Sequence, residues 1–179
     1  KTTGQPVEDP VETHFRQDPD VSSIEATQNT SLTYTAVIDG AIEITKCYDF
    51  KPAEKTIFLT ITFHNLSTSE RTLSYRIYPC QGFTHTPDEV HEFAALAVDE
   101  YGDTESKRGA GLDHDAVKNG KTPVELVTGE KIWWSGVAGR YFASALKKEQ
   151  ANLAGSGAEL LSEPGSENIQ VASYLESAE

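Results

Sequence analysis

The side chains that could do chemistry in this sequence are histidines, cysteines and carboxylates. The five histidines are His14, His64, His85, His91 and His114. A zinc site needs ligands at short, fixed spacings on a rigid element, and no two of these histidines have such a spacing. The acids of Asp113–Asp115 could hold a hard cation weakly, but alternating acids beside a glycine are typical of a solvated loop. We therefore expect no metal and no other cofactor.

A catalytic nucleophile would have to be Cys80 or Ser135. Cys80 could use the nearby His85 as a base, but the pair falls at a strand end and in a turn, with no neighbour that would activate a thiol. Ser135 lacks the flanking glycines of a nucleophile elbow. No glycine-rich loop follows a strand and opens a helix, so nucleotide binding has no support. We expect neither activity.

Carboxylates offer a third kind of chemistry. Glu92 or Glu125 could act with His85 as base and acid in a cleft that isomerises a sugar. A chain with 28 Asp and Glu residues yields such combinations by chance. We therefore expect a protein that is not an enzyme, and we keep sugar binding as an alternative.

Composition and charge exclude several classes of function. The 179 residues contain 28 acidic against 15 basic side chains, a formal net charge of -13. Nucleic acids and anionic membrane surfaces are bound by clustered Lys and Arg, so neither is an expected partner. No apolar run reaches the roughly 20 residues of a membrane-spanning helix. Without a Met or a signal-peptide pattern at its start, the chain is interpreted as a soluble piece of a longer protein.

The spacing of apolar residues predicts a mainly β protein. Residues 1–30 contain three prolines and a Ser/Thr/Asn-rich stretch, which predicts an extended N-terminal arm. From residue 31 onwards, short runs alternate between apolar and polar residues, with turn signals between them. This pattern favours an antiparallel β-sandwich over residues 31–179, with a hairpin turn at Asp39-Gly40 and loose loops near 101–121 and 153–168. The expected strands are Ser31–Val37, Ala41–Phe50, Thr56–Asn65, Leu73–Tyr78, Phe93–Asp99, Pro123–Val127, Lys131–Val137, Arg140–Leu146 and Ile169–Leu175.

Two further expectations concern His64 and the two cysteines. His64 follows an apolar strand face by one position, so we expect it on the surface. The sequence leaves open whether Cys47 and Cys80 form a disulfide bridge. Lone cysteines are more often simply buried.

The most informative stretch is Lys131–Leu146, KIWWSGVAGRYFASAL. It predicts a hairpin whose turn is Gly136–Arg140. Because neighbouring residues of a strand point to opposite faces, one of Trp133 and Trp134 can anchor the core while the other meets a second layer or solvent. Arg140 beside Tyr141 can stack locally. Trp133, Trp134, Arg140 and Tyr141 are therefore the candidate contact residues for a partner or substrate.

This hairpin resembles the pattern near the end of the periplasmic domain of bacterial YidC-type membrane protein insertases. In that family a Gly/Trp-rich strand leads through a short turn into a Tyr-Phe-Ala-x-Ala strand, as Trp134–Val137 and Arg140–Leu146 do here. The resemblance extends over about residues 31–146. It also includes Leu32–Tyr34, the strand end Asp49-Phe50 and a Thr-Pro-Asp-Glu turn at Thr86–Glu89. Only the final hairpin is fairly specific, and the leading strands of the family domain are missing or altered.

The resemblance implies a β-supersandwich of the galactose-mutarotase type on the periplasmic side of the bacterial inner membrane. Its implied partners are the Sec translocon and nascent membrane proteins, reached through the full-length insertase. The family's membrane segments are absent from this chain, so the implied role is that of a scaffold or docking module. Two alternatives remain, a carbohydrate-binding or mutarotase-like sandwich and a secreted adhesion-type sandwich.

Overall fold

A computed structural model describes residues 14–25, 27–79, 83–84, 93–120, 123–129, 131–149, 153–166 and 169–177. The chain divides into two compact units, which we call unit 1, ending at Arg71, and unit 2, beginning at Thr72. This boundary differs from the predicted division into an arm of residues 1–30 and one domain over 31–179. Both units are built from antiparallel strands, so the predicted mainly β class is confirmed.

Unit 1 is a single sheet of four antiparallel strands in the order β1 (Arg16–Asp18), β2 (Thr30–Ile38), β3 (Ile42–Lys51) and β4 (Thr56–Asn65). The predicted turn between β2 and β3 is confirmed, with Asp39 at φ 51° and Gly40 at φ 64°. Two consecutive positive φ values are those of a two-residue hairpin turn whose twist matches the strands. Strand β1 lies inside the stretch that was predicted as an arm.

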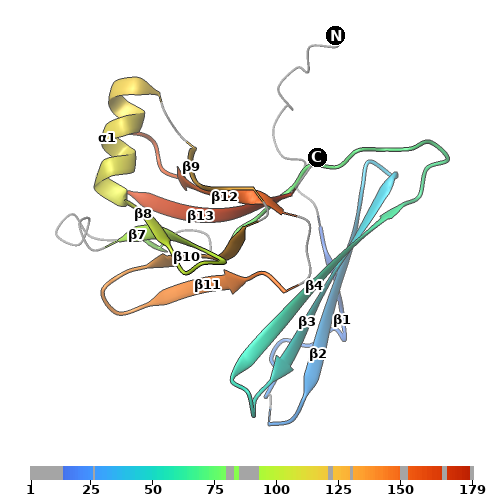
Figure 1. Cartoon of the computed structure of the whole chain (residues 1–179). Coiled ribbons are helices and arrows are strands. Elements are labelled where there is room, and N and C mark those ends of the chain that lie inside the picture. Colours follow the sequence, from blue (N-terminus) through green and yellow to red (C-terminus); the bar gives the residue numbers. More distant parts are fainter. Residues whose placement is uncertain are drawn as a thin grey trace. The chain divides into compact units, whose positions relative to one another are not determined.

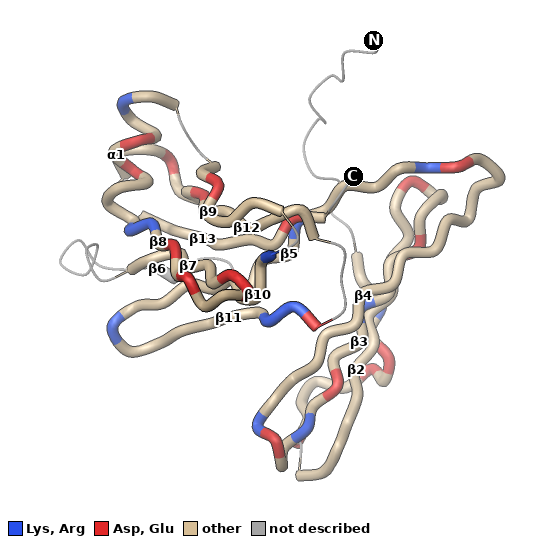
Figure 2. Tube along the Cα trace, in the orientation of Figure 1, with Lys and Arg blue, Asp and Glu red and all other residues tan. Residues whose placement is uncertain are grey.

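The register of unit 1 separates its side chains by polarity. Leu32 pairs with Tyr48, and Tyr48 pairs with Leu59, so apolar residues of three strands share one face. The opposite face carries Thr, Asp, Glu and the free thiol of Cys47. Strands β2 and β4 contain no Lys, Arg, Asp or Glu, and their traces carry neither charge colour in Figure 2.

Unit 2 is a sandwich of two sheets (Figure 1). The first has the order β11 (Ala143–Lys147), β10 (Ile132–Ala138), β7 (Ala94–Asp99) and β8 (Thr104–Arg108). The second has the order β5 (Arg76–Ile77), β13 (Gln170–Ser177), β12 (Leu153–Leu160) and β9 (Val124–Thr128), with β6 (Phe83–Thr84) also paired to β13.

The core of unit 2 lies between these two sheets. One cluster joins Ala97 and Ile132 of the first sheet to Leu153 and Leu175 of the second. Polar groups are also buried there, and two of them are hydrogen-bonded: Ser156 donates to Ser135 over 2.8 Å, and Ser135 donates to the carbonyl of Tyr174 over 3.3 Å. Buried hydroxyls need such partners, because an unpaired one costs stability. The buried hydroxyl of Ser173 has no hydrogen-bond partner among the described residues.

The predicted loop near 101–121 is wrong, since this stretch forms β8 and the helix α1 (Gly109–Asn119). The two glycines of the helix and its Asp and His residues are poor helix formers, which explains the error. Leu112 and Ala116, four residues apart, bury one side of the helix, and Leu112 joins a core cluster with Ala95, Ala158, Ile169 and Val171. Tertiary packing thus overrides the weak local preference.

The predicted loop near 153–168 is also wrong over its first half, which is strand β12 at the centre of the second sheet. Its glycines suggested a loose stretch, but two of them are required by close packing. A Cβ atom on Gly155 would lie 2.4 Å from the carbonyl oxygen of Val127, and one on Gly157 would lie 2.2 Å from the hydroxyl of Tyr174. Glycine here marks close approach of neighbouring groups.

Candidate functional site

The predicted hairpin exists, as β10 and β11, with its turn at residues 139–142, slightly later than expected. The expectation that one tryptophan anchors the core is wrong: Trp133 is 42% exposed and Trp134 36% exposed. The register shifts between Ile132 and Trp134, so Trp133 is an extra residue in the strand. Such a bulge breaks the alternation on which the expectation rested. The two indole rings contact each other, with their centroids 6.1 Å apart.

The outer face of β7, β10 and β11 contains an apolar groove of about 300 Å³. Trp134 lies at one end, and the lining side chains are otherwise small or aliphatic, among them Leu96, Val98 and Ala143. Gly136 forms the middle of the groove. A Cβ atom there would lie 2.7 Å from the backbone oxygen of Ser144, so only glycine lets β10 and β11 approach this closely.

The turn of the hairpin exposes two more aromatic rings. Tyr141 is 71% and Phe142 72% exposed. The guanidinium of Arg140 lies 5.4 Å from the centroid of the Tyr141 ring, which confirms the predicted local stacking. The four candidate contact residues therefore all belong to one hairpin, with the tryptophans at one end and Arg140 and Tyr141 at the other.

The remaining chemistry predicted from the sequence is not assembled by the described residues. Outside the described residues lie Cys80, His85, His91, Glu92 and the turn Thr86–Glu89. Because Cys80 is among them, the question of a Cys47–Cys80 bridge also falls outside the described residues. His64 is exposed, as predicted, with Nδ1 3.9 Å from Glu43. Among the described residues no group of His, Cys, Asp or Glu is arranged to hold a metal ion.

The acids around His114 have structural roles. Asp113 accepts a hydrogen bond from the backbone N–H of Gly165 over 2.6 Å. Asp115 pairs with Lys107 over 2.8 Å, which ties α1 to β8, and this contact lowers the pKa of the Asp115 carboxyl. Both carboxylates are therefore engaged by the protein itself.

A cluster that the sequence did not predict lies on the outer face of the second sheet. Arg76 pairs with Glu176 over 3.1 Å and with Glu159 over 3.4 Å, and its guanidinium lies 4.2 Å from the centroid of the Tyr174 ring. Tyr174 is buried and lies against Tyr78. One arginine thus links β5, β12 and β13 by charge and by ring contact.

The tyrosines of this cluster are held in their neutral form. Burial raises the pKa of Tyr78 to about 12, and a hydrogen bond to Glu159 acts in the same direction, while Arg76 opposes both. Burial also raises the pKa of Tyr174. Both effects disfavour the phenolate, as expected for groups removed from water beside carboxylates.

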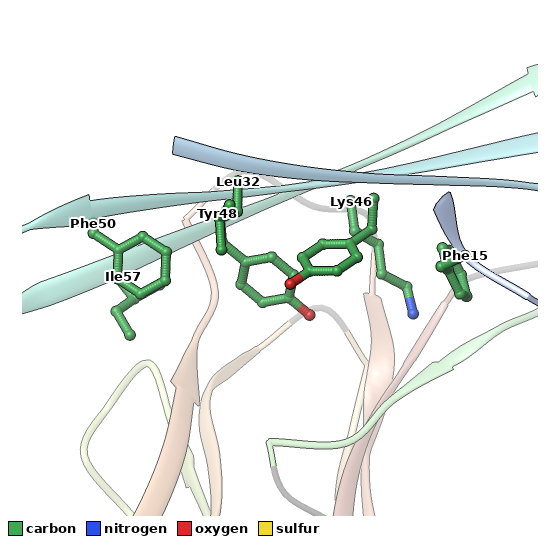
Figure 3. Close-up of a pocket in the computed structure, with 7 residues that line it drawn as sticks. Phe15, Leu32, Lys46, Tyr48, Phe50 and Ile57 are labelled. Atoms are coloured by element: carbon green, nitrogen blue, oxygen red, sulfur yellow. The ribbon is translucent and has the colours of Figure 1, made fainter. Parts of the chain in front are cut away.

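Unit 1 has a second hollow, of about 450 Å³, on the apolar face of its sheet (Figure 3). It is lined by Phe15, Leu32, Tyr34, Lys46, Tyr48, Phe50 and Ile57. The labelled side chains project from the same face of the sheet in Figure 3. The Tyr34 and Tyr48 rings meet edge to face at 5.8 Å.

Different sequence signals could have revealed the hollow of unit 1 and the cluster around Arg76. The alternation in Ala41–Phe50 puts Lys46 on the same strand face as Ile44 and Tyr48, and this pattern was the available signal for the hollow. Phe15 was missed because its stretch was predicted as an arm. Nothing local indicates that Arg76 meets Glu176, since the two are 100 positions apart.

Comparison with known proteins found no matching family model, no matching curated protein and no matching solved structure. Of the helices formed by the described residues, none is long and apolar enough to cross a membrane.

Proposed function

We propose that the chain is the periplasmic domain of a YidC-type membrane protein insertase, where it serves as a non-catalytic scaffold or docking module. The observation that supports this best is the hairpin β10–β11. Its residues follow the family pattern, and Gly136 occupies a position where a larger residue would push the two strands apart. The sandwich of unit 2 is compatible with the supersandwich of that family.

The same hairpin supplies the surface for docking. Exposed aromatic side chains are costly to leave in water and often supply the energetic centre of protein interfaces. Trp133 and Trp134 lie beside the apolar groove, with Tyr141 and Phe142 at the far end of the hairpin. In this proposal the partner is the Sec translocon or an apolar segment of a nascent membrane protein, at the outer surface of the inner membrane.

Binding of purified Sec translocon in nanodiscs tests the docking role. We expect Trp134→Ala to weaken binding of the 179-residue chain about tenfold or more, as truncation of a central interface tryptophan does. Val117→Ala is the matched control, because Val117 is an exposed apolar residue on α1, outside the hairpin. Unchanged binding by both Trp134→Ala and Tyr141→Ala would show that the hairpin is not part of the interface. Absence of binding by the unsubstituted chain would contradict the docking role.

The reading frame of the parent gene tests the family assignment separately. The proposal requires one apolar span upstream of Lys1 and several downstream of Glu179. A reading frame without such spans would contradict it and would leave the sugar-binding and adhesion alternatives.

One observation favours the carbohydrate-binding alternative. The outer face of the second sheet places the carboxylates of Glu159 and Glu176 next to the Tyr174 ring and Arg76. A pair of carboxylates is the usual catalytic equipment of carbohydrate-active sites. Calorimetric titration with monosaccharides and disaccharides tests this reading. Binding that Glu159→Gln abolishes would support it, and absence of binding would contradict it.

A further inference from the structure

The hollow of unit 1 contains a charged group that the proposed function does not use. Lys46 projects from the middle of β3 into this hollow, and its Nζ lies 4.1 Å from the centroid of the Phe15 ring (Figure 3). The side chain is half-buried. Within the part of the chain that the structure describes, no carboxylate forms an ion pair with it.

The register makes Lys46 exceptional on its face. Lys46 pairs with Tyr34 on one side and Ile61 on the other, so these three side chains share the apolar face. Every other charged side chain within the four strands falls on the opposite face: Arg16, Asp18, Glu43, Asp49 and Lys51. A lone ammonium among apolar residues is expensive to desolvate unless an anion accompanies it.

These properties define the chemistry of an occupant. The walls are aromatic and aliphatic, and the polar side-chain groups that line the hollow are the Lys46 ammonium and the hydroxyls of Tyr34 and Tyr48. A sugar needs many hydrogen bonds to replace those it makes with water, and this lining offers few. A volume of about 450 Å³ falls within the range of small-molecule sites.

We propose that this hollow binds a small amphiphilic carboxylate, a molecule with an apolar body and a single carboxylate group. The apolar body lies against Leu32, Phe50 and Ile57, and the carboxylate accepts a charge-assisted hydrogen bond from Lys46. The formal net charge of -13 repels anions from the chain as a whole. Affinity for a carboxylate therefore depends on the local cation.

The same sheet provides a matched control. Lys51 lies on the opposite, polar face, with its Nζ 4.3 Å from the centroid of the Phe58 ring. It reproduces the contact between ammonium and aromatic ring without the hollow. Replacing either lysine by methionine removes one positive charge and keeps an apolar side chain of similar length.

Calorimetric titration of the full chain with decanoate and with decanol tests the proposal. Decanoate, kept below its micelle concentration, is expected to bind at one site about tenfold more tightly than decanol, because only decanoate carries the charge. Lys46→Met should reduce decanoate affinity to that of decanol, and Lys51→Met should leave it unchanged. Amide NMR shifts should map to β2 and β3.

Four results would overturn the proposal. Equal affinity of the parent chain for decanoate and decanol would show that the charge plays no part, and this comparison needs no variant. Equal losses in the two lysine variants would point to general electrostatics instead of a site. Shifts confined to the hairpin β10–β11 would place the ligand in the groove of unit 2, while binding of a neutral disaccharide in the hollow would favour a sugar site. The proposal concerns residues of unit 1 and is independent of the insertase assignment.

Discussion

Units 1 and 2 share one sequence pattern but differ in how deeply they bury their apolar side chains. Both consist of antiparallel strands in which apolar and polar residues alternate. In unit 2 the apolar faces of two sheets meet, and Leu153, Val137 and Val171 are almost completely buried. In unit 1 a single sheet carries the apolar residues, and those of β4 are half-buried or exposed, with Ile57 57% exposed.

The comparison shows what alternation determines and what it leaves open. It fixes which residues share a face, because the side-chain period of a strand is two. Whether that face becomes a core depends on a second layer, which the strand itself does not encode. The half-buried face of unit 1 is therefore where a ligand can bind, while the buried faces of unit 2 are occupied by their own core.

The largest effect is expected from truncating one leucine in each unit, a core leucine in unit 2 and a half-buried one in unit 1. Leu153→Ala removes a side chain that is 1% exposed and should lower the free energy of unfolding by about 3 kcal/mol. Leu59→Ala, on the half-buried face of unit 1, should cost about 1 kcal/mol, because less apolar surface leaves water there. Urea unfolding followed by circular dichroism measures both. Equal losses would mean that the face of unit 1 is packed as tightly as a core, and would contradict the difference between the two units.

Glycine substitutions should give an intermediate effect with a different cause in each unit. In unit 2, Gly157→Ala forces the Tyr174 ring away and should cost about 2 kcal/mol through overpacking. In unit 1, Gly40→Ala meets no atom within 4 Å, and its cost of about 1 kcal/mol comes from the positive φ of 64° alone.

The Tyr174→Ala background separates the two causes. There Gly157→Ala should cost much less than in the unsubstituted chain, because the space that the new methyl group needs is already free. Gly40→Ala should cost the same in both backgrounds. An equal cost of Gly157→Ala in both backgrounds would contradict the steric explanation, and thermal unfolding of the single and double variants measures these costs.

Much of the fold could be predicted from the sequence because the required signals are local. The alternation in Thr56–Asn65 gave β4 with both bounds correct, and Asp39-Gly40 gave the hairpin before it. What failed depends on distant partners. Helix α1 forms because Leu112 meets the core of the sandwich, and β12 tolerates its glycines because Val127 and Tyr174 fill the space above them. The sequence of the segment itself does not show these distant partners.

The candidate sites divide in the same way. The hairpin residues Trp133 to Tyr141 were found from their types and order, yet the orientation of the tryptophans was wrong, since a bulge cannot be seen in the sequence. The cluster around Arg76 was missed because its members come from three strands that are far apart in the chain. The position of one hairpin can thus be predicted, whereas clusters assembled by the pairing of distant strands need the structure.

The smallest effect is expected from alkaline titration of Tyr78, which tests burial in unit 2 directly. Its pKa is about 12 in the folded protein against an ordinary value of 10.0, so the unfolded chain loses this proton first as pH rises. The stabilisation from the neutral phenol is therefore complete below pH 10 and is lost between about pH 10 and 12. Because Tyr78 is only partly shielded from solvent, we expect a loss of about 1 kcal/mol.

The measurement is the difference in unfolding free energy between the unsubstituted chain and Tyr78→Phe at pH 9 and pH 11. A difference that does not change over this interval would mean that the Tyr78 hydroxyl is as well hydrated as an exposed one, and that the Arg76 cluster is as open to water as the apolar face of unit 1.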